Sequence, residues 1–293
     1  MKLTNNHNLP SVVADALAFS DYTKGDSLLS VTQLIDSPRV SLLQRRHDDD
    51  IEQDVSDLIW SRMGTSVHEM FERATEGRAE TISEERLFAE VNGWRISGAI
   101  DLQEMVDGGV IVSDYKVTSA WSVIFDKAEW HKQLNCYAWL VRHAKSLNVK
   151  QLRIIAVLRD WARRRAQDGG DYPDSPIQVI DIPMWPDEEQ DRYVEERVQL
   201  HQAADYEHET GGVLPDCSAE ERWEKATTFA VRKKNRIRAI KVHAVEEEAQ
   251  DHAQKLGGDA HYVEKRVGES TRCTQDWCRV NQWCSQWKEA NNG

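Results

Sequence analysis

The 293-residue sequence lacks several features that would place it in well-known classes of protein. No apolar stretch approaches the length of about 20 residues that a membrane-spanning helix needs, so no membrane partner is expected. Residues 1–7 lack the apolar core of a secretory signal peptide, which predicts a cytoplasmic protein, in the host cytoplasm if a phage encodes it. No Gly-x-x-x-x-Gly-Lys-Ser/Thr loop is present, so the sequence encodes no ATP-driven unwinding.

The charge balance is acidic, with a formal net charge of −13, which by itself argues against a nucleic-acid partner. The distribution matters more than the sum, because basic residues are concentrated in residues 159–165 and 232–238. Both runs are candidates for phosphate contacts, and Trp161 in the first could stack on a base. Solvated charged loops would give the same pattern, so both interpretations stay open.

Two acidic residues and a lysine are predicted at neighbouring strands. The alternation of residues 94–102 predicts a strand that carries Asp101. Residues 110–116 predict a second strand ending in Asp114 and Lys116, whose i, i+2 spacing places both side chains on one face. If the strands pair, the two carboxylates meet beside the lysine. A lone Asp-x-Lys is more often a solvated strand end, but paired carboxylates are the hard oxygen ligands that Mg²⁺ or Mn²⁺ requires.

Two predicted helices carry polar residues at helical spacing. Gly64, His68 and Glu72 follow one another at intervals of four and therefore share one helix face. Gln133 and Tyr137 have the same spacing on the helix after the strands. Each has a local explanation when taken alone, because a single histidine on an amphipathic helix is more often a surface residue than a ligand.

Together these motifs resemble the PD-(D/E)XK nuclease superfamily, specifically its RecB-like branch, which includes phage exonucleases and the nucleases of CRISPR adaptation. The resemblance covers residues 30–137. It rests on four elements in the family's order: Gly64-Thr-Ser-Val-His68, Gly98-Ala-Ile-Asp101, Asp114-Tyr-Lys116 and Gln133-Leu-Asn-Cys-Tyr137. It implies an α/β fold with a mixed central β-sheet flanked by helices.

The resemblance also implies a role for each residue of the motifs. The ligands of the catalytic Mg²⁺ or Mn²⁺ would be His68, Asp101, Asp114 and the main-chain carbonyl of Tyr115. Lys116 would activate water and stabilise the transition state. Gln133 and Tyr137 would steer the phosphate backbone or support Lys116. Glu72 and Glu90 are further candidates for contacts with the ligands or with a second metal.

The predicted elements divide the chain into three parts. Residues 1–29 show no strong periodicity and are expected to form a loosely ordered lead-in. Residues 30–210 form the nuclease core, and residues 211–293 form a cysteine-rich appendage. Within the core, helices are expected at 30–38, 54–76, 129–146 and 186–208, and strands at 85–92, 94–103, 110–117, 152–158 and 177–182.

Four of the five cysteines lie in the appendage: Cys217, Cys273, Cys278 and Cys284. Clustered thiols in a cytosolic chain favour a metal site over disulfides. Four thiolates suit Zn²⁺ or a 4Fe–4S cluster, but no pair has the Cys-x-x-Cys spacing of most zinc ribbons. Several nucleases of the resembled branch carry an iron–sulfur cluster, which favours iron over zinc.

One departure from those relatives concerns the fourth cysteine ligand. Their distant cysteine usually precedes the nuclease core, where this sequence has Ser37. Cys217 would therefore have to supply the fourth ligand from the other side of the core. The alternative is that Cys217 is a small buried residue and that the site is incomplete or binds zinc. Cys136 is expected to pack in the core.

The sequence thus predicts a metal-dependent DNA nuclease, with an exonuclease that processes ends in recombination, repair or phage replication as the favoured form. Its expected partners are single- or double-stranded DNA ends and a single-strand annealing or recombination protein. Two other functions fit the same residues: a spacer-trimming nuclease of CRISPR adaptation, and a non-catalytic DNA-binding protein built on a nuclease fold.

Overall fold

The computed structural model describes residues 1–20, 23–125, 127–275 and 277–291. Contacts divide the chain into two units, Met1–Leu42 with Asp48–Pro215, and Leu43–His47 with Asp216–Gly293. The second unit starts close to the expected boundary at residue 210, but the assignment of independent domains stays a prediction. None of the described helices is long and apolar enough to cross a membrane.

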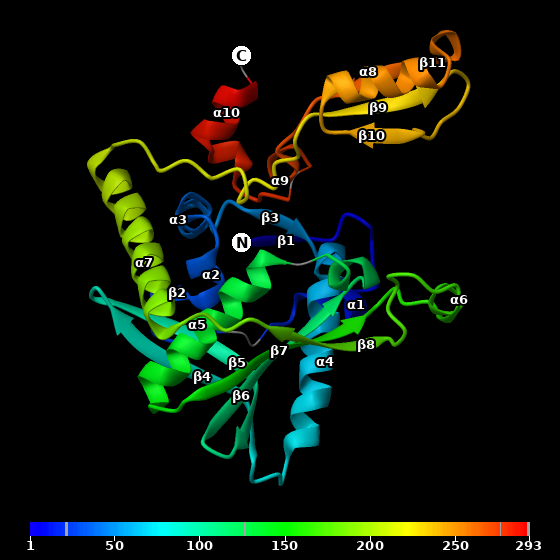
Figure 1. Cartoon of the computed structure of the whole chain (residues 1–293). Coiled ribbons are helices and arrows are strands. Elements are labelled where there is room, and N and C mark those ends of the chain that lie inside the picture. The colour runs from blue at the N-terminus through cyan, green and yellow to red at the C-terminus, as the bar shows by residue number, and fades with distance from the viewer. Residues whose placement is uncertain (21–22, 126, 276, 292–293) are drawn as a thin grey trace. The chain divides into compact units, whose positions relative to one another are not determined.

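The first unit is built on a mixed six-stranded sheet, as predicted (Figure 1). Its strands are β2 (Leu29–Ser30), β4 (Thr81–Val91), β5 (Trp94–Val106), β6 (Gly109–Thr118), β7 (Val149–Leu158) and β8 (Ile177–Ile182). The strand order is β2-β5-β6-β7-β8, in which β2 and β6 pair with different stretches of the same edge of β5. The opposite edge of β5 pairs with β4. The β6–β7 and β2–β5 pairs are parallel, and the β4–β5, β5–β6 and β7–β8 pairs are antiparallel.

The edge of β5 that faces β6 changes its partner along the strand. β6 pairs with β5 over residues 102–106, and β2 pairs with the same strand at residues 96–97. Residues 98–101, which include the predicted Gly98 and Asp101, lie between these two stretches. The sheet therefore opens at the position of the predicted motif.

Helices surround this sheet. The first unit holds α2 (Val31–Ile35), α4 (Ile59–Thr75), α5 (Ala128–Lys145), α6 (Arg163–Gln167) and α7 (Asp187–Thr210), and α3 (Pro38–Arg46) runs from the first unit into the second. α5 buries ten residues and contacts five strands, so it is the central helix of the core, and α7 packs beside it (Figure 1). The helix predicted over residues 54–76 begins as a 3₁₀ turn at Val55–Leu58 and becomes α-helical at Ile59.

Two local features bring the motif residues into place. The β4–β5 hairpin turns at Asn92 and Gly93, whose positive φ values of 49° and 76° are those of a type I′ turn. Gly98 lies under α5, and a Cβ there would come within 2.8 Å of the Tyr137 ring and 2.7 Å of Leu140. Glycine at this position therefore lets α5 approach the sheet closely.

The first 29 residues, expected to be loosely ordered, contain regular elements. β1 (Lys2–Thr4) pairs in parallel with β3 (Glu52–Asp54), and α1 (Ser11–Ala18) follows β1. A three-residue strand shows no periodicity, and its partner is about 50 residues away, so only the tertiary structure reveals the pairing.

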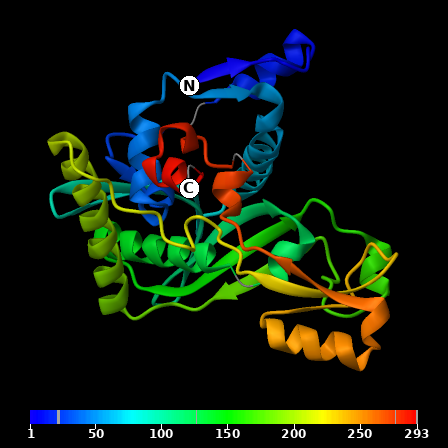
Figure 2. The ribbon, with the colours of Figure 1, turned by 90° about the horizontal axis from the view of Figure 1, so that it is seen from above.

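The second unit contains a small antiparallel sheet that the sequence did not predict. Its strands, in the order β10-β9-β11, are β9 (Thr228–Lys233), β10 (Lys241–His243) and β11 (His261–Arg266). α8 (Glu246–Lys255) covers one face through a small core of Val231, Ala249 and Ala253 (Figure 2). The unit ends with α9 (Thr271–Thr274) and α10 (Ser285–Asn291). Sequence periodicity does not reveal these strands, because β10 is short and basic residues interrupt the alternation of β9.

Candidate active site

Three neighbouring strands each contribute one carboxylate at the same level of the sheet. The β4–β5 register on either side of Glu84 places this residue opposite Asp101. The β5–β6 register ends one residue short of Asp101 and Asp114, which are next in line across the two strands. The structure thus brings Asp101 and Asp114 together as predicted, and it adds Glu84.

His68 projects from α4 into this group of carboxylates. Its Nδ1 lies 3.1 Å from Glu84 Oε1 and 3.6 Å from Asp101 Oδ1, and its Nε2 lies 3.3 Å from the carbonyl oxygen of Tyr115. Burial acts to lower the pKa of His68. The hydrogen bond to Glu84 and the negative charges of Asp101, Glu84 and Asp114 outweigh burial and raise this pKa to about 8. Without a metal, an imidazolium therefore stands among the carboxylates.

Asp101 is buried and accepts a 2.6 Å hydrogen bond from the main-chain N–H of Tyr115. Burial and the neighbouring charge of Asp114 raise the pKa of Asp101 well above its ordinary value. His68, the Tyr115 N–H and Lys116 act in the opposite direction without cancelling this effect. A cation bound beside Asp101 would favour its ionised form and so stabilise the group.

Lys116 and Asp114 are held together by Gln133 of α5. The Gln133 side-chain oxygen accepts a 3.0 Å hydrogen bond from Lys116 Nζ, and its amide nitrogen donates to Asp114 Oδ1 at 3.0 Å and to the Tyr137 hydroxyl at 2.9 Å. The spacing of Gln133 and Tyr137 thus positions the Asp-x-Lys pair. Their contacts match the predicted support of Lys116, whereas contact with a phosphate backbone stays a prediction.

The donor set fits a divalent cation. Lys116 Nζ lies 2.5 Å from Asp114 Oδ2, but off the direction of a hydrogen bond, and within the described part of the chain this buried oxygen accepts no hydrogen bond. The possible ligand atoms of His68, Glu84 and Asp101 lie within 4.8 Å of one another. Carboxylates, an imidazole and the Tyr115 carbonyl are suitable ligands for Mg²⁺ or Mn²⁺.

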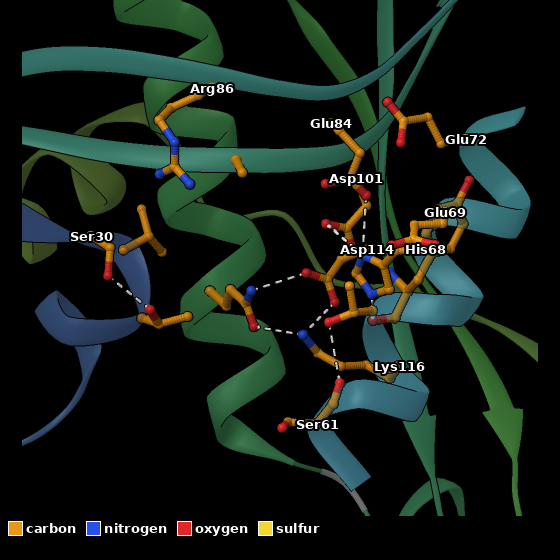
Figure 3. Close-up of a pocket in the computed structure, with 18 of the residues that line it drawn as sticks. Ser30, Ser61, His68, Glu69, Glu72, Glu84, Arg86, Asp101, Asp114 and Lys116 are labelled. Atoms are coloured by element: carbon orange, nitrogen blue, oxygen red, sulfur yellow. Dashed lines mark hydrogen bonds and ion pairs between the residues drawn. The ribbon is translucent and has the colours of Figure 1, made fainter. Parts of the chain in front are cut away.

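These groups line a pocket of about 680 Å³ between α4 and α5. Figure 3 shows the carboxylates and His68 toward α4, and Arg86 and Ser30 on the other side of the pocket. The Arg86 guanidinium donates a 3.2 Å hydrogen bond to Ser97. The pocket therefore has an acidic side that suits a metal and a side with a cation and hydroxyl groups that suits a phosphate.

Glu84 was not among the residues predicted for the site. Its motif-free surroundings, Ser-Glu-Glu-Arg, give no sign of which glutamate faces the pocket. The structural sign is a φ of 50° in the middle of a strand, a conformation that is uncommon outside glycine and often marks a functional position. Of the other two candidates, Glu72 lines the pocket and Glu90 does not.

Two residues of the first basic run contact their own unit, whereas Arg163, Arg164 and Arg165 of the same run are exposed. Trp161 packs against the core and donates a hydrogen bond to the Pro173 carbonyl, so it is not free to stack on a base in this conformation. Arg159 lies over the Trp60 ring at 4.5 Å.

The C-terminal cysteines lie together in the second unit. Burial raises the pKa of Cys273, and the neighbouring thiols of Cys278 and Cys284 raise it further. The main chain of Cys217 exchanges two hydrogen bonds with the side chain of Gln286, two residues after Cys284. Cys136 lies apart in the nuclease core, where burial raises its pKa to about 12.

The chain is similar to a known family and, more distantly, to solved structures. A family described as the PD-(D/E)XK nuclease superfamily matches residues 32–285. Among solved structures, a protein named SSO0001 is 18% identical and matches 65% of this chain and 82% of its own, with a TM-score of 0.43. A protein of Eubacterium rectale named as a candidate exonuclease is 14% identical and matches 69% of this chain and 73% of its own, with a TM-score of 0.29. No curated protein sequence matches the chain.

Proposed function

The chain belongs to the PD-(D/E)XK nuclease superfamily, and from this membership we propose that it is a divalent-metal-dependent DNA exonuclease of the RecB-like branch. One observation carries the proposal: Asp101, Asp114 and Lys116 converge in one pocket, with Gln133 bonded to both members of the Asp-x-Lys pair. A catalytically dead scaffold would have no need to keep this arrangement.

The residues of the pocket would have different roles in catalysis. His68, Asp101, Asp114 and the Tyr115 carbonyl would hold Mg²⁺ or Mn²⁺, with Glu84 as an additional ligand or as the partner that orients His68. When bound, the cation polarises a phosphodiester oxygen and lowers the pKa of a bound water. The Lys116 ammonium, held by Gln133, would stabilise the negative charge that develops around phosphorus.

Arg86 would bind a second phosphate of the same strand. It lies on the side of the pocket away from the carboxylates, and a guanidinium forms paired hydrogen bonds to phosphate oxygens. A DNA strand bound at both sides would be fixed in position before hydrolysis. Such positioning of the reacting groups supplies a large part of the lowering of the barrier in phosphoryl transfer.

An assay on labelled linear DNA and on the same DNA as a closed circle tests the function. The expected result is degradation of the linear form with Mn²⁺, no degradation in EDTA, and survival of the circle. End labels then give the polarity. Asp114→Ala and Lys116→Ala should each lower the rate by orders of magnitude, because a ligand and a transition-state contact are removed. Normal rates in either variant, or no cleavage by the parent chain, would refute the proposal.

We also propose that Cys217, Cys273, Cys278 and Cys284 hold an iron–sulfur cluster rather than zinc. Cys273 lies beside the thiols of Cys278 and Cys284, and Cys217 exchanges hydrogen bonds with Gln286, two residues after Cys284. No pair of these cysteines has the Cys-x-x-Cys spacing of most zinc ribbons, which favours iron.

The cluster has a direct test with a control inside the chain. Anaerobically purified protein should be brown and contain iron and sulfide, and Cys217→Ser should remove the colour as completely as Cys278→Ser. Cys136→Ser is the matched control, since Cys136 lies in the nuclease core. Stoichiometric zinc in a colourless protein would contradict the choice of iron. A brown Cys217→Ser protein would show that the fourth ligand is another residue.

A further inference from the structure

The second unit carries a basic hairpin, which we define as β9, β10 and the connecting residues 234–240. Six of the ten residues from 232 to 241 are arginine or lysine and none is acidic, in a chain whose net charge is −13. Five of these cations are exposed: Lys233, Lys234, Arg236, Arg238 and Lys241. The hairpin therefore carries one of the two basic runs of the chain.

The sixth cation, Arg232, fixes the shape of the tip. Its guanidinium forms an ion pair with Glu264 of β11 and donates hydrogen bonds to the main-chain carbonyls of Arg236 and Ile237, at 3.1 and 2.9 Å. The Lys234 N–H donates to the Ala260 carbonyl at 2.9 Å. The tip is thus held from β9 and from the residue before β11, and its cations are presented on a fixed backbone.

An apolar side chain stands at this tip. Ile237 is 93% exposed and is flanked by Arg236 and Arg238. Its main-chain carbonyl is bonded to Arg232, so the exposure belongs to an ordered turn. Proteins that enter a DNA groove use this combination, in which cations contact phosphates on both sides and an apolar residue contacts or wedges between bases.

We propose that the basic hairpin is a duplex-DNA docking element that enters a groove, with Arg236 and Arg238 on phosphates and Ile237 against the bases. A two-stranded β-ribbon fits the major groove of B-DNA. A flat anionic membrane is a poorer match, because membrane binding depends on buried apolar area and Ile237 offers only one apolar side chain at the tip. The inference rests on the proposed function only in taking DNA as the substrate.

The test measures binding of the full chain to a fluorescent duplex over a series of salt concentrations, in EDTA so that no cleavage occurs. Each phosphate contact contributes about 0.9 to the slope of log affinity against log salt. Arg236→Ser/Arg238→Ser should therefore lower the slope by about 1.8 and weaken binding up to about 60-fold at 0.1 M salt. Ile237→Ser should weaken binding with an unchanged slope.

A matched control removes the same charge elsewhere. Arg192→Ser/Lys255→Ser changes two helix cations outside the hairpin, one in α7 and one at the end of α8, and should leave the slope unchanged. If Arg236→Ser/Arg238→Ser unfolds, as judged by its melting temperature, Lys233→Gln/Lys234→Gln provides the same comparison.

Several results would overturn the inference: an unchanged slope in both hairpin variants, an equal loss in the control, or weakened binding to a single strand but not to the duplex. Binding of the hairpin to anionic phospholipid vesicles with duplex affinity unchanged would assign it to a membrane instead. Cleavage is measured separately. Hairpin-dependent binding without cleavage would refute only the nuclease proposal, whereas cleavage with hairpin-independent binding would refute only this one.

Discussion

Removal of Lys116 should destabilise the metal-free protein, because it leaves a buried carboxylate without its cation. The Asp114 side chain is 2% exposed, and Lys116 Nζ lies 2.5 Å from its Oδ2. Loss of one partner from a fully buried ion pair costs about 3–5 kcal/mol. The Lys116 side chain is 26% exposed, so water can replace part of the interaction, and Gln133 still donates to Oδ1. We therefore expect Lys116→Ala to cost about 2 kcal/mol, or roughly 5 °C in melting temperature.

The assay is thermal unfolding in EDTA and in Mn²⁺. Manganese should raise the melting temperature of Lys116→Ala by more than that of the parent, because the metal replaces the missing positive charge. Lys116→Ala/Asp114→Asn should recover most of the lost stability in EDTA, since the charge that needs a partner is gone. Lys145→Ala is the control: it breaks an ion pair of the same 2.5 Å length, but its partner Glu85 is 34% exposed.

A Lys116→Ala protein as stable as the parent in EDTA would refute this reasoning. So would a double variant no more stable than the single one, because the cost would then arise from lost packing rather than from the carboxylate. A manganese response in Lys145→Ala larger than in the parent would show that the metal effect is not specific to the pocket.

Three further predictions concern the same pocket. His68→Ala should weaken metal affinity more than it lowers stability, so raised Mn²⁺ should partly restore cleavage, and calorimetric titration should show the weaker binding. Arg86→Ala should raise KM for an oligonucleotide more than it lowers kcat, whereas a merely structural Arg86 would change stability without this split. Gly98→Ala should cost about 1–3 kcal/mol in thermal unfolding, because its new Cβ would lie 2.7 Å from Leu140 and 2.8 Å from the Tyr137 ring, and these buried side chains must move. A Gly98→Ala protein that melts like the parent would contradict the close approach.

The strands of the large sheet and most residues of the pocket could be predicted from the sequence, because local patterns encode them. The strands that carry Asp101, Asp114 and Lys116 are recognisable from their alternating or apolar residues. The interval of four between Gln133 and Tyr137 places them on one face of any helix. The remainder depends on tertiary structure. Glu84 joins the site through strand register and an unusual φ, neither of which residue type reveals. β1 and the small sheet of the second unit pair across long separations, which local periodicity does not report.

The second unit is built from two separate segments of the chain, which limits how the chain could change during evolution. Leu43–His47 belongs to this unit although about 170 residues of the first unit separate it from Asp216–Gly293. Within the unit the ring of His47 stacks on Trp283, with the centroids 4.3 Å apart and the planes 3° from parallel. A genetic exchange that moved only the C-terminal segment would leave this ring behind. The basic hairpin and the cysteines could therefore pass to another scaffold intact only if a compatible helix were already present there. Inheritance together with the nuclease core is the simpler route.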